Sequence, residues 1–223
     1  MLMAATLWGM YIRSRRIVIT KESIARTGVL IGAMLVSCIP LFFDKLIIGH
    51  DTIIQLLRLE GIKDGYLAGQ LPVKVEPTFC GGYGYAFSIF YGSLFYNIPA
   101  LLRLMGFSIQ FSYKMYVALI NIATVLISYY SFFVMLKNKK NAVIASVLYS
   151  LSVYRFYDLY QRGAVGEYTA MTFLPLIAVG LWKIYTSPDD KNLRKMWVMP
   201  VIGFWGVIQS HVLSTEIYGA FTL

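Results

Sequence analysis

The stretch FSYKMYVALINIATVLISYYSFFVML, residues 111–136, decides the fold of this chain. Lys114 is its one charged residue. A helix needs about 20 apolar residues to cross the roughly 30 Å hydrocarbon layer of a bilayer. Residues 117–136 do not alternate between apolar and polar, so they do not fit a barrel strand. Because lipid offers no partner to backbone N–H and C=O groups, the stretch predicts a membrane-spanning helix.

Apolar runs of similar character occur in other parts of the chain, at residues 27–43, 168–185 and 196–223, with a shorter fifth candidate at 141–157. Overall, 58% of the residues are hydrophobic and 14% are charged. Soluble domains usually carry about 25% charged residues. The sequence therefore predicts an all-α, polytopic transmembrane bundle of about five spans, with the lipid bilayer as its main partner.

The basic residues gather in three segments between the predicted spans, which the positive-inside rule assigns to the cytoplasm. On this topology the outer side has equal numbers of basic and acidic residues, so the whole net charge of +9 lies inside. This placement indicates a multi-pass membrane protein with a cytoplasmic N-terminus and does not indicate nucleic-acid binding. The residues are Arg13, Arg15, Arg16, Lys21 and Arg26, then Lys137, Lys139 and Lys140, then Lys183, Lys191, Arg194 and Lys195.

This topology divides the chain into four predicted regions: a cytoplasmic basic segment (1–26), a first span (27–43), a long outer loop (44–110) and spans two to five (111–223). Loops as long as 44–110 are usually functional or disordered, and the apolar and aromatic content of this one argues against disorder. Residues 85–104 would shift the following lysines outside if they crossed the membrane, so we expect a re-entrant or interfacial segment.

Several features narrow the function. The segment Cys80-Gly-Gly-Tyr-Gly-Tyr85 lacks the Gly-Lys-Ser/Thr ending of a P-loop and predicts a tight turn. Two cysteines, Cys38 and Cys80, are predicted to be free, and two histidines are too few for a dense metal cage. A divalent metal is possible but not required. Residues 1–12 do not fit a secretory signal peptide, and the apolar C-terminus leads us to expect a longer polytopic protein.

The first candidate site residues are His50 and Asp51, in the sequence Gly-His-Asp directly after the first span. A helix over 52–59 is predicted next. Asp51 thus lies at the lipid–water boundary, where a carboxylate can serve as a general base or bind a metal for a lipid-linked substrate. Alternatively, Asp51 caps the helix by accepting its free N–H groups.

A second group of candidates comes before and after the fourth span. In a continuing helix, Asp158 meets Arg155 at i−3 and Arg162 at i+4, which describes either a stable surface motif or two guanidiniums able to hold a phosphate. Glu167 begins the fourth span, where the helix dipole favours an acid, and His211 lies in the last apolar run. All of these side chains are predicted on the outer side.

These motifs resemble large bacterial membrane proteins, namely the YfhO-like proteins and the family labelled "6-pyruvoyl-tetrahydropterin synthase-related". The resemblance covers roughly residues 27–215. It implies a GT-C glycosyltransferase fold, an acidic catalytic residue in the first outer loop, matched by Asp51, and a sugar donor on polyprenyl phosphate. The sequence departs from the paired acidic motif of that superfamily, which places metal dependence in question. The quoted stretches are Gly49-His50-Asp51, 90–96, 152–155, 162–167 and 210–214.

The expected function is transfer of a sugar from a polyprenyl-phosphate donor at the outer face of the bacterial cell membrane. Asp51 and Glu167 are the expected catalytic residues, and the expected substrate-binding residues are His50, Arg155, Asp158, Arg162 and His211. Two alternatives remain open. One is a transporter or lipid flippase, and the other is a non-catalytic membrane subunit of envelope assembly.

Overall fold

The computed structural model describes residues 20–186 and 197–222. Within these ranges the chain forms ten α-helices with short 3₁₀ and π segments and no sheet, and Glu76 and Tyr85 form an isolated bridge. The all-α prediction is confirmed. The apolar segment 1–12 and several predicted cytoplasmic basic residues lie outside the described residues, namely Arg13, Arg15, Arg16, Lys191, Arg194 and Lys195.

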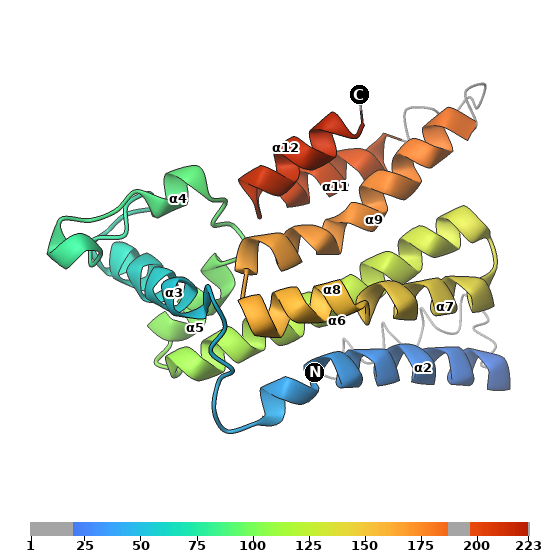
Figure 1. Ribbon diagram of the computed structural model, residues 1–223, viewed down its shortest axis with the longest axis horizontal. Helices are drawn as coiled ribbons and strands as arrows, with labels where there is room; N and C mark the ends of the chain where they lie inside the picture. Colours follow the sequence, from blue (N-terminus) through green and yellow to red (C-terminus); the bar gives the residue numbers. More distant parts are fainter. Residues whose placement is uncertain (1–19, 187–196, 223) are drawn as a thin grey trace, which may run out of the picture.

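Three helices are long and apolar enough to cross a membrane. They are α2 (Lys21–Cys38), continued by the 3₁₀ helix η1 (Ile39–Phe42), then α6 (Ile109–Leu136) and α9 (Val165–Thr186). Helix α2 begins earlier than predicted because Thr20 Oγ1 accepts the Ser23 N–H at 3.1 Å. In Figure 1 the three helices run along the long axis, and the elements of residues 44–108 gather at one end.

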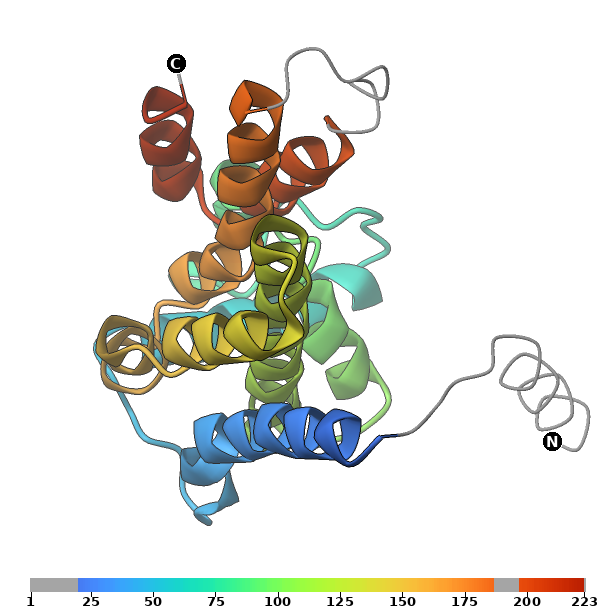
Figure 2. The same ribbon diagram turned by 90° about the vertical axis from the view of Figure 1, so that its right-hand side faces the viewer.

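The other two predicted spans are broken, which corrects the expectation of about five continuous helices. The run 141–157 divides into α7 (Lys139–Ser150), α8 (Val153–Phe156) and the π-helix η3 (Tyr157–Arg162), because Ser152 adopts an extended conformation. The last run divides into α11 (Val198–Ile208) and α12 (Val212–Ala220) at the extended residue His211. Figure 2, viewed along the bundle, shows α2, α7 and α9 around α6.

Residues 44–110, predicted to form a long outer loop, are ordered into helices. It contains α3 (Thr52–Leu67), the short α4 (Phe87–Phe90) and α5 (Asn97–Leu104). The helix predicted after Asp51 is confirmed and runs beyond 59. Residues 80–84 form the predicted tight turn, with positive φ angles that include 67° at Gly81. Residues 85–104 do not form one continuous helix, and their position relative to the membrane stays a prediction.

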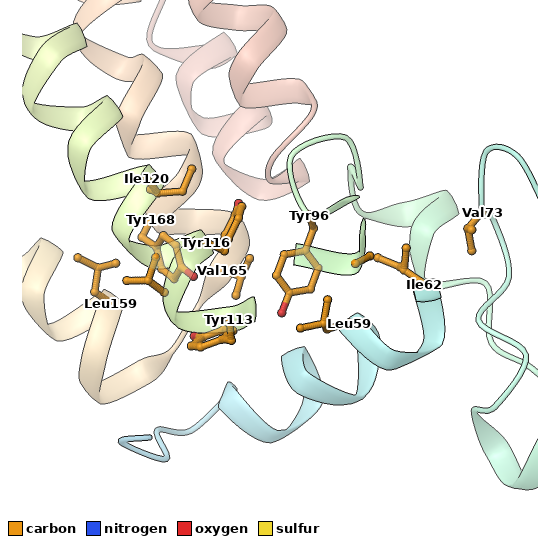
Figure 3. Close-up of a cluster of buried hydrophobic side chains, with 12 residues drawn as sticks. Leu59, Ile62, Val73, Tyr96, Tyr113, Tyr116, Ile120, Leu159, Val165 and Tyr168 are labelled. Carbon is orange, nitrogen blue, oxygen red and sulfur yellow. The ribbon is translucent and has the colours of Figure 1, made fainter. Parts of the chain in front are cut away.

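A buried cluster fastens this loop to the ends of the long helices (Figure 3). Tyr96 packs edge-on against Tyr116 of α6, with ring centroids 5.3 Å apart, and its hydroxyl donates to the Gln55 carbonyl of α3 at 2.9 Å. Leu59 of α3 and Tyr168 of α9 belong to the same cluster and are fully buried. The start of α3 is therefore held against the start of α9, where the candidate site lies.

Candidate functional site

The site begins with a close contact between two loops. A Cβ atom on Gly49 would lie 2.4 Å from the Gln161 carbonyl oxygen, so only glycine fits here. The His50 and Asp51 N–H groups donate to the carbonyls of Gln161 and Arg162 at 3.3 and 2.7 Å. These bonds join the start of α3 to the end of η3, although the two segments are more than 100 residues apart in sequence.

Two further glycines bring the start of α9 into the site. Gly163 has a φ of 70°, and a Cβ there would lie 2.3 Å from Thr52 Oγ1. Gly166 faces the break between α11 and α12, where a Cβ would lie 2.9 Å from His211 Cδ2. The glycines thus allow the starts of α3, α9 and α12 to approach within van der Waals distance.

A pocket of about 260 Å³ opens where these segments meet. It contains four of the seven predicted site residues. The helices α3 and α9, whose first turns contribute to it, begin at the end of the bundle opposite the end of α6 (Figure 1). Its lining residues are Asp51, Ile54, Gln55, Phe87, Tyr91, Arg162, Ala164, Gly166, Glu167, His211 and Leu213.

The Asp51 side chain does not cap α3, so the capping interpretation is wrong. Thr52, the first residue of α3, makes a different local contact, in which its Oγ1 accepts the Gly49 N–H at 2.9 Å. Within the described part of the chain, no hydrogen bond or ion pair to the Asp51 carboxylate is present. Its oxygen atoms remain available to the pocket.

Arg162 and Glu167 form the charged wall of the pocket. Arg162 Nη1 lies 2.8 Å from Glu167 Oε2 and 3.1 Å from Asp158 Oδ1. The second Glu167 oxygen accepts the Tyr154 hydroxyl, and this bond raises the pKa of Tyr154 to about 12. Arg162 uses one nitrogen for both acids and is about a third exposed, with a relative side-chain area of 32%. Its Nε and Nη2 groups have no hydrogen-bond partner among the described residues.

Asp158 lies just behind this wall and is fully buried. Its contact with Arg162 lacks hydrogen-bond alignment, and both carboxyl oxygens are without a hydrogen-bond partner in the described ranges. Burial raises the pKa of Asp158 to about 7, the negative charge of Glu167 adds to the rise, and the Arg162 and Arg155 charges oppose it. At Asp158, desolvation therefore outweighs the attraction of two guanidiniums and favours the protonated carboxyl.

His211 completes the pocket from the opposite side. Its Nδ1 accepts the Ser214 N–H at 3.3 Å and lies 2.8 Å from Ser214 Oγ, an arrangement that caps α12. In the neutral ring the proton is therefore on Nε2. Burial lowers the pKa of His211, which favours this neutral form. The ring lies beside Tyr91, with centroids 5.7 Å apart.

Arg155 and His50 do not line this pocket. The Arg155 guanidinium is fully buried and donates to Asn121 Oδ1 at 2.8 Å and Thr124 Oγ1 at 2.9 Å, both in the middle of α6. No ion pair joins Arg155 to Asp158 in the described residues, so the predicted i+3 bridge is absent. His50 is exposed, and its backbone N–H makes the contact that holds the loop.

Seven lining residues were not among the predicted site residues, and three of these seven, Gln55, Phe87 and Tyr91, are polar or aromatic. Gln55 is four residues after Asp51 and so shares its face of α3, a spacing that was available from the sequence. Its Oε1 is buried without a hydrogen-bond partner in the described structure. Phe87 and Tyr91 belong to the aromatic segment that we interpreted as a membrane-interface feature. The described residues contain no group of three or more His, Cys, Asp or Glu side chains placed to hold a metal.

Comparison with models of known protein families gave no match, and neither did comparison with curated protein sequences or with solved structures. The resemblance drawn from the sequence motifs therefore stays a prediction.

Proposed function

We propose that this chain is a multi-pass membrane glycosyltransferase that takes a sugar from a polyprenyl-phosphate donor at the outer face of the bacterial cell membrane. One observation carries the proposal. The pocket at the ends of the long helices contains three polar groups without a hydrogen-bond partner among the described residues. They are the Asp51 carboxylate, the Nε and Nη2 groups of Arg162, and Gln55 Oε1. These groups suit a hydroxyl nucleophile, a phosphate leaving group and a sugar hydroxyl, respectively.

In the proposed reaction, Asp51 removes the proton from the acceptor hydroxyl, and the acceptor oxygen forms a bond to the anomeric carbon. The bond from that carbon to the phosphate oxygen breaks, and the polyprenyl phosphate leaves with the electron pair. The Nε and Nη2 groups of Arg162 donate to the phosphate oxygens and stabilise the charge that develops there. Proton, bonds and charge are balanced without a further reactant.

The neighbouring residues support these roles. Glu167 is committed to Arg162 and Tyr154, so we assign it to positioning the guanidinium and no longer to proton transfer. The neutral His211 presents its Nε2–H as a hydrogen-bond donor for the substrate. Phe87 and Tyr91 supply the apolar wall on the side of α4.

The test is sugar transfer by the purified chain in nanodiscs, supplied with a panel of polyprenyl-phosphate hexoses and measured as release of polyprenyl phosphate. Asp51→Asn keeps the size of the side chain and removes the base, so we expect a loss of about 10²- to 10⁴-fold. The matched control is Asp44→Asn, an exposed acid of the same loop that does not line the pocket. Asp51→Asn at the wild-type rate would remove Asp51 from the mechanism, and no release from any donor would refute the proposed reaction.

Arg155 favours a second candidate, a transporter or lipid flippase. Ionisable side chains in the middle of membrane helices mark transport pathways, and the Arg155 guanidinium bonds to Asn121 and Thr124 near the centre of α6. Accumulation of a lipid-linked sugar across vesicles without covalent product, abolished by Arg155→Gln, would support transport over transfer. Nothing in the pocket favours the non-catalytic alternative.

A further inference from the structure

A second groove lies at the other end of the bundle, away from the pocket. It has a volume of about 420 Å³ and lies between α2 and α7, which run side by side (Figures 1 and 2). Its walls are mostly aliphatic, and two basic side chains, Arg26 and Lys140, line it together with one acid, Glu22. The aliphatic lining residues are Ala25, Val29, Val143 and Ile144.

We propose that this groove binds an anionic phospholipid of the cytoplasmic leaflet, with the headgroup phosphate between Arg26 and Lys140 and an acyl chain along the aliphatic wall. Basic pockets between transmembrane helices on the cytoplasmic side are suited to such headgroups. Three more lysines, Lys21, Lys137 and Lys139, are exposed near the same end of the bundle. By the positive-inside rule this end faces the cytoplasm.

The two basic residues can both reach a phosphate. Lys140 makes no ion pair within the described part of the chain. Arg26 Nη1 lies 3.3 Å from Glu22 Oε2, but the Glu22 side chain is exposed, with a relative area of 86%. An exposed pair of this kind contributes little to stability. A phosphate can therefore replace Glu22 as the partner of Arg26 at low cost.

The apolar part of the groove explains why a lipid fits better than a free anion. Val29 and Ile144 have about half of their surface exposed, 51% and 50%, at the opening between α2 and α7. Both helices are aligned along the bundle, so an acyl chain that follows the groove runs parallel to the lipids around it. Inside the bilayer the acyl chain is already in hydrocarbon, so the groove adds packing contacts rather than hydrophobic burial, and the charged headgroup provides the selectivity.

The test is native mass spectrometry of the full chain released from nanodiscs that contain phosphatidylglycerol as a minority lipid in phosphatidylcholine. We expect retained phosphatidylglycerol on the wild type. The double variant Arg26→Gln/Lys140→Gln should lower its preference over phosphatidylcholine by about thirtyfold, from about 1 kcal/mol per basic residue. The control Lys137→Gln/Lys139→Gln removes the same charge from the same end but not from the groove, and should change the preference less than threefold.

A variant that increases lipid binding distinguishes a loss of the site from a loss of the fold. Glu22→Gln removes the one acid of the groove and should raise phosphatidylglycerol retention by about fivefold, which a damaged chain would not do. Equal losses from the two double variants would show a diffuse surface-charge effect and overturn the proposal. Displacement of the lipid by inorganic phosphate would refute the contact between the acyl chain and the groove. Equal retention of both lipids by the wild type would refute selective binding of the anionic lipid.

Discussion

The burial of Asp158 leads to a prediction about pH and stability that Asp158→Asn can test. The Asp158 carboxyl is fully buried, has no aligned hydrogen bond in the described residues, and has a pKa raised by burial to about 7. Asparagine has nearly the same shape but does not ionise. The variant therefore isolates the free energy of ionising this one buried group.

The sign follows from proton binding in the two states. An aspartate in the unfolded chain has a pKa of about 3.9. Between that value and about pH 7 the folded state holds one proton more than the unfolded state, so the free energy of unfolding falls as pH rises, and it stays low above pH 7. A pKa difference of about 3 corresponds to at most about 4 kcal/mol, and we expect about 2–4 kcal/mol.

The assay is unfolding by sodium dodecyl sulfate in mixed micelles, followed by tryptophan fluorescence at pH 5 and pH 8. Asp158→Asn should exceed the wild type by about 1.5 kcal/mol at pH 5 and by about 2–4 kcal/mol at pH 8. The lowered pKa of His211 acts with the opposite sign, because it favours folding at higher pH. The difference between variant and wild type cancels that contribution.

Two outcomes would refute the reasoning. If Asp158→Asn were less stable than the wild type at pH 8, the ionised carboxylate would be stabilising, and its attraction to Arg162 would outweigh burial. If the difference between the two chains were the same at both pH values, Asp158 would not titrate between them. Asp44→Asn, an exposed acid, serves as the control and should show no pH-dependent difference.

Three other substitutions test the packing of the site and bundle in the same unfolding assay. Gly166→Ala should lower stability by about 1–3 kcal/mol because its Cβ meets His211, whereas Gly28→Ala in open space should raise it by about 0.5–1 kcal/mol; equal effects would contradict the contact. Gly163→Ala should lower the free energy of unfolding by about 1–2 kcal/mol because of the positive φ at this position alone. Asn121→Leu should lower the free energy of unfolding by about 2–3 kcal/mol because Arg155 loses one of its two hydrogen-bond partners, and adding Arg155→Leu should recover most of it.

The sequence predicted those parts of the fold that follow from single apolar runs. Each of α2, α6 and α9 could be found because crossing lipid requires length and apolarity, which are local properties. The breaks at Ser152 and His211 could not be found in this way, because apolar residues continue on both sides of them. The tight turn at residues 80–84 followed from its glycines alone.

Within the candidate site, the sequence identified Asp51, Arg162 and Glu167 as polar residues near the ends of apolar runs, and His211 as one inside the last run. The structure brings these four together. It could not place Arg155. A regular helix puts Arg155 beside Asp158, but the chain passes into a π-helix at Tyr157, and Arg155 instead faces Asn121 across the bundle.

What the sequence by itself determined is the class of the protein, an all-helical chain with helices that suit a membrane, because hydropathy and helix length are set residue by residue. What only the tertiary structure decided is which polar groups remain free: Asp51 is uncommitted, Glu167 is bonded to Arg162, and Asp158 is buried without an aligned partner. The physical reason is that hydrogen bonding and desolvation depend on neighbours from distant segments. Those neighbours meet here only because glycines allow the backbones to approach.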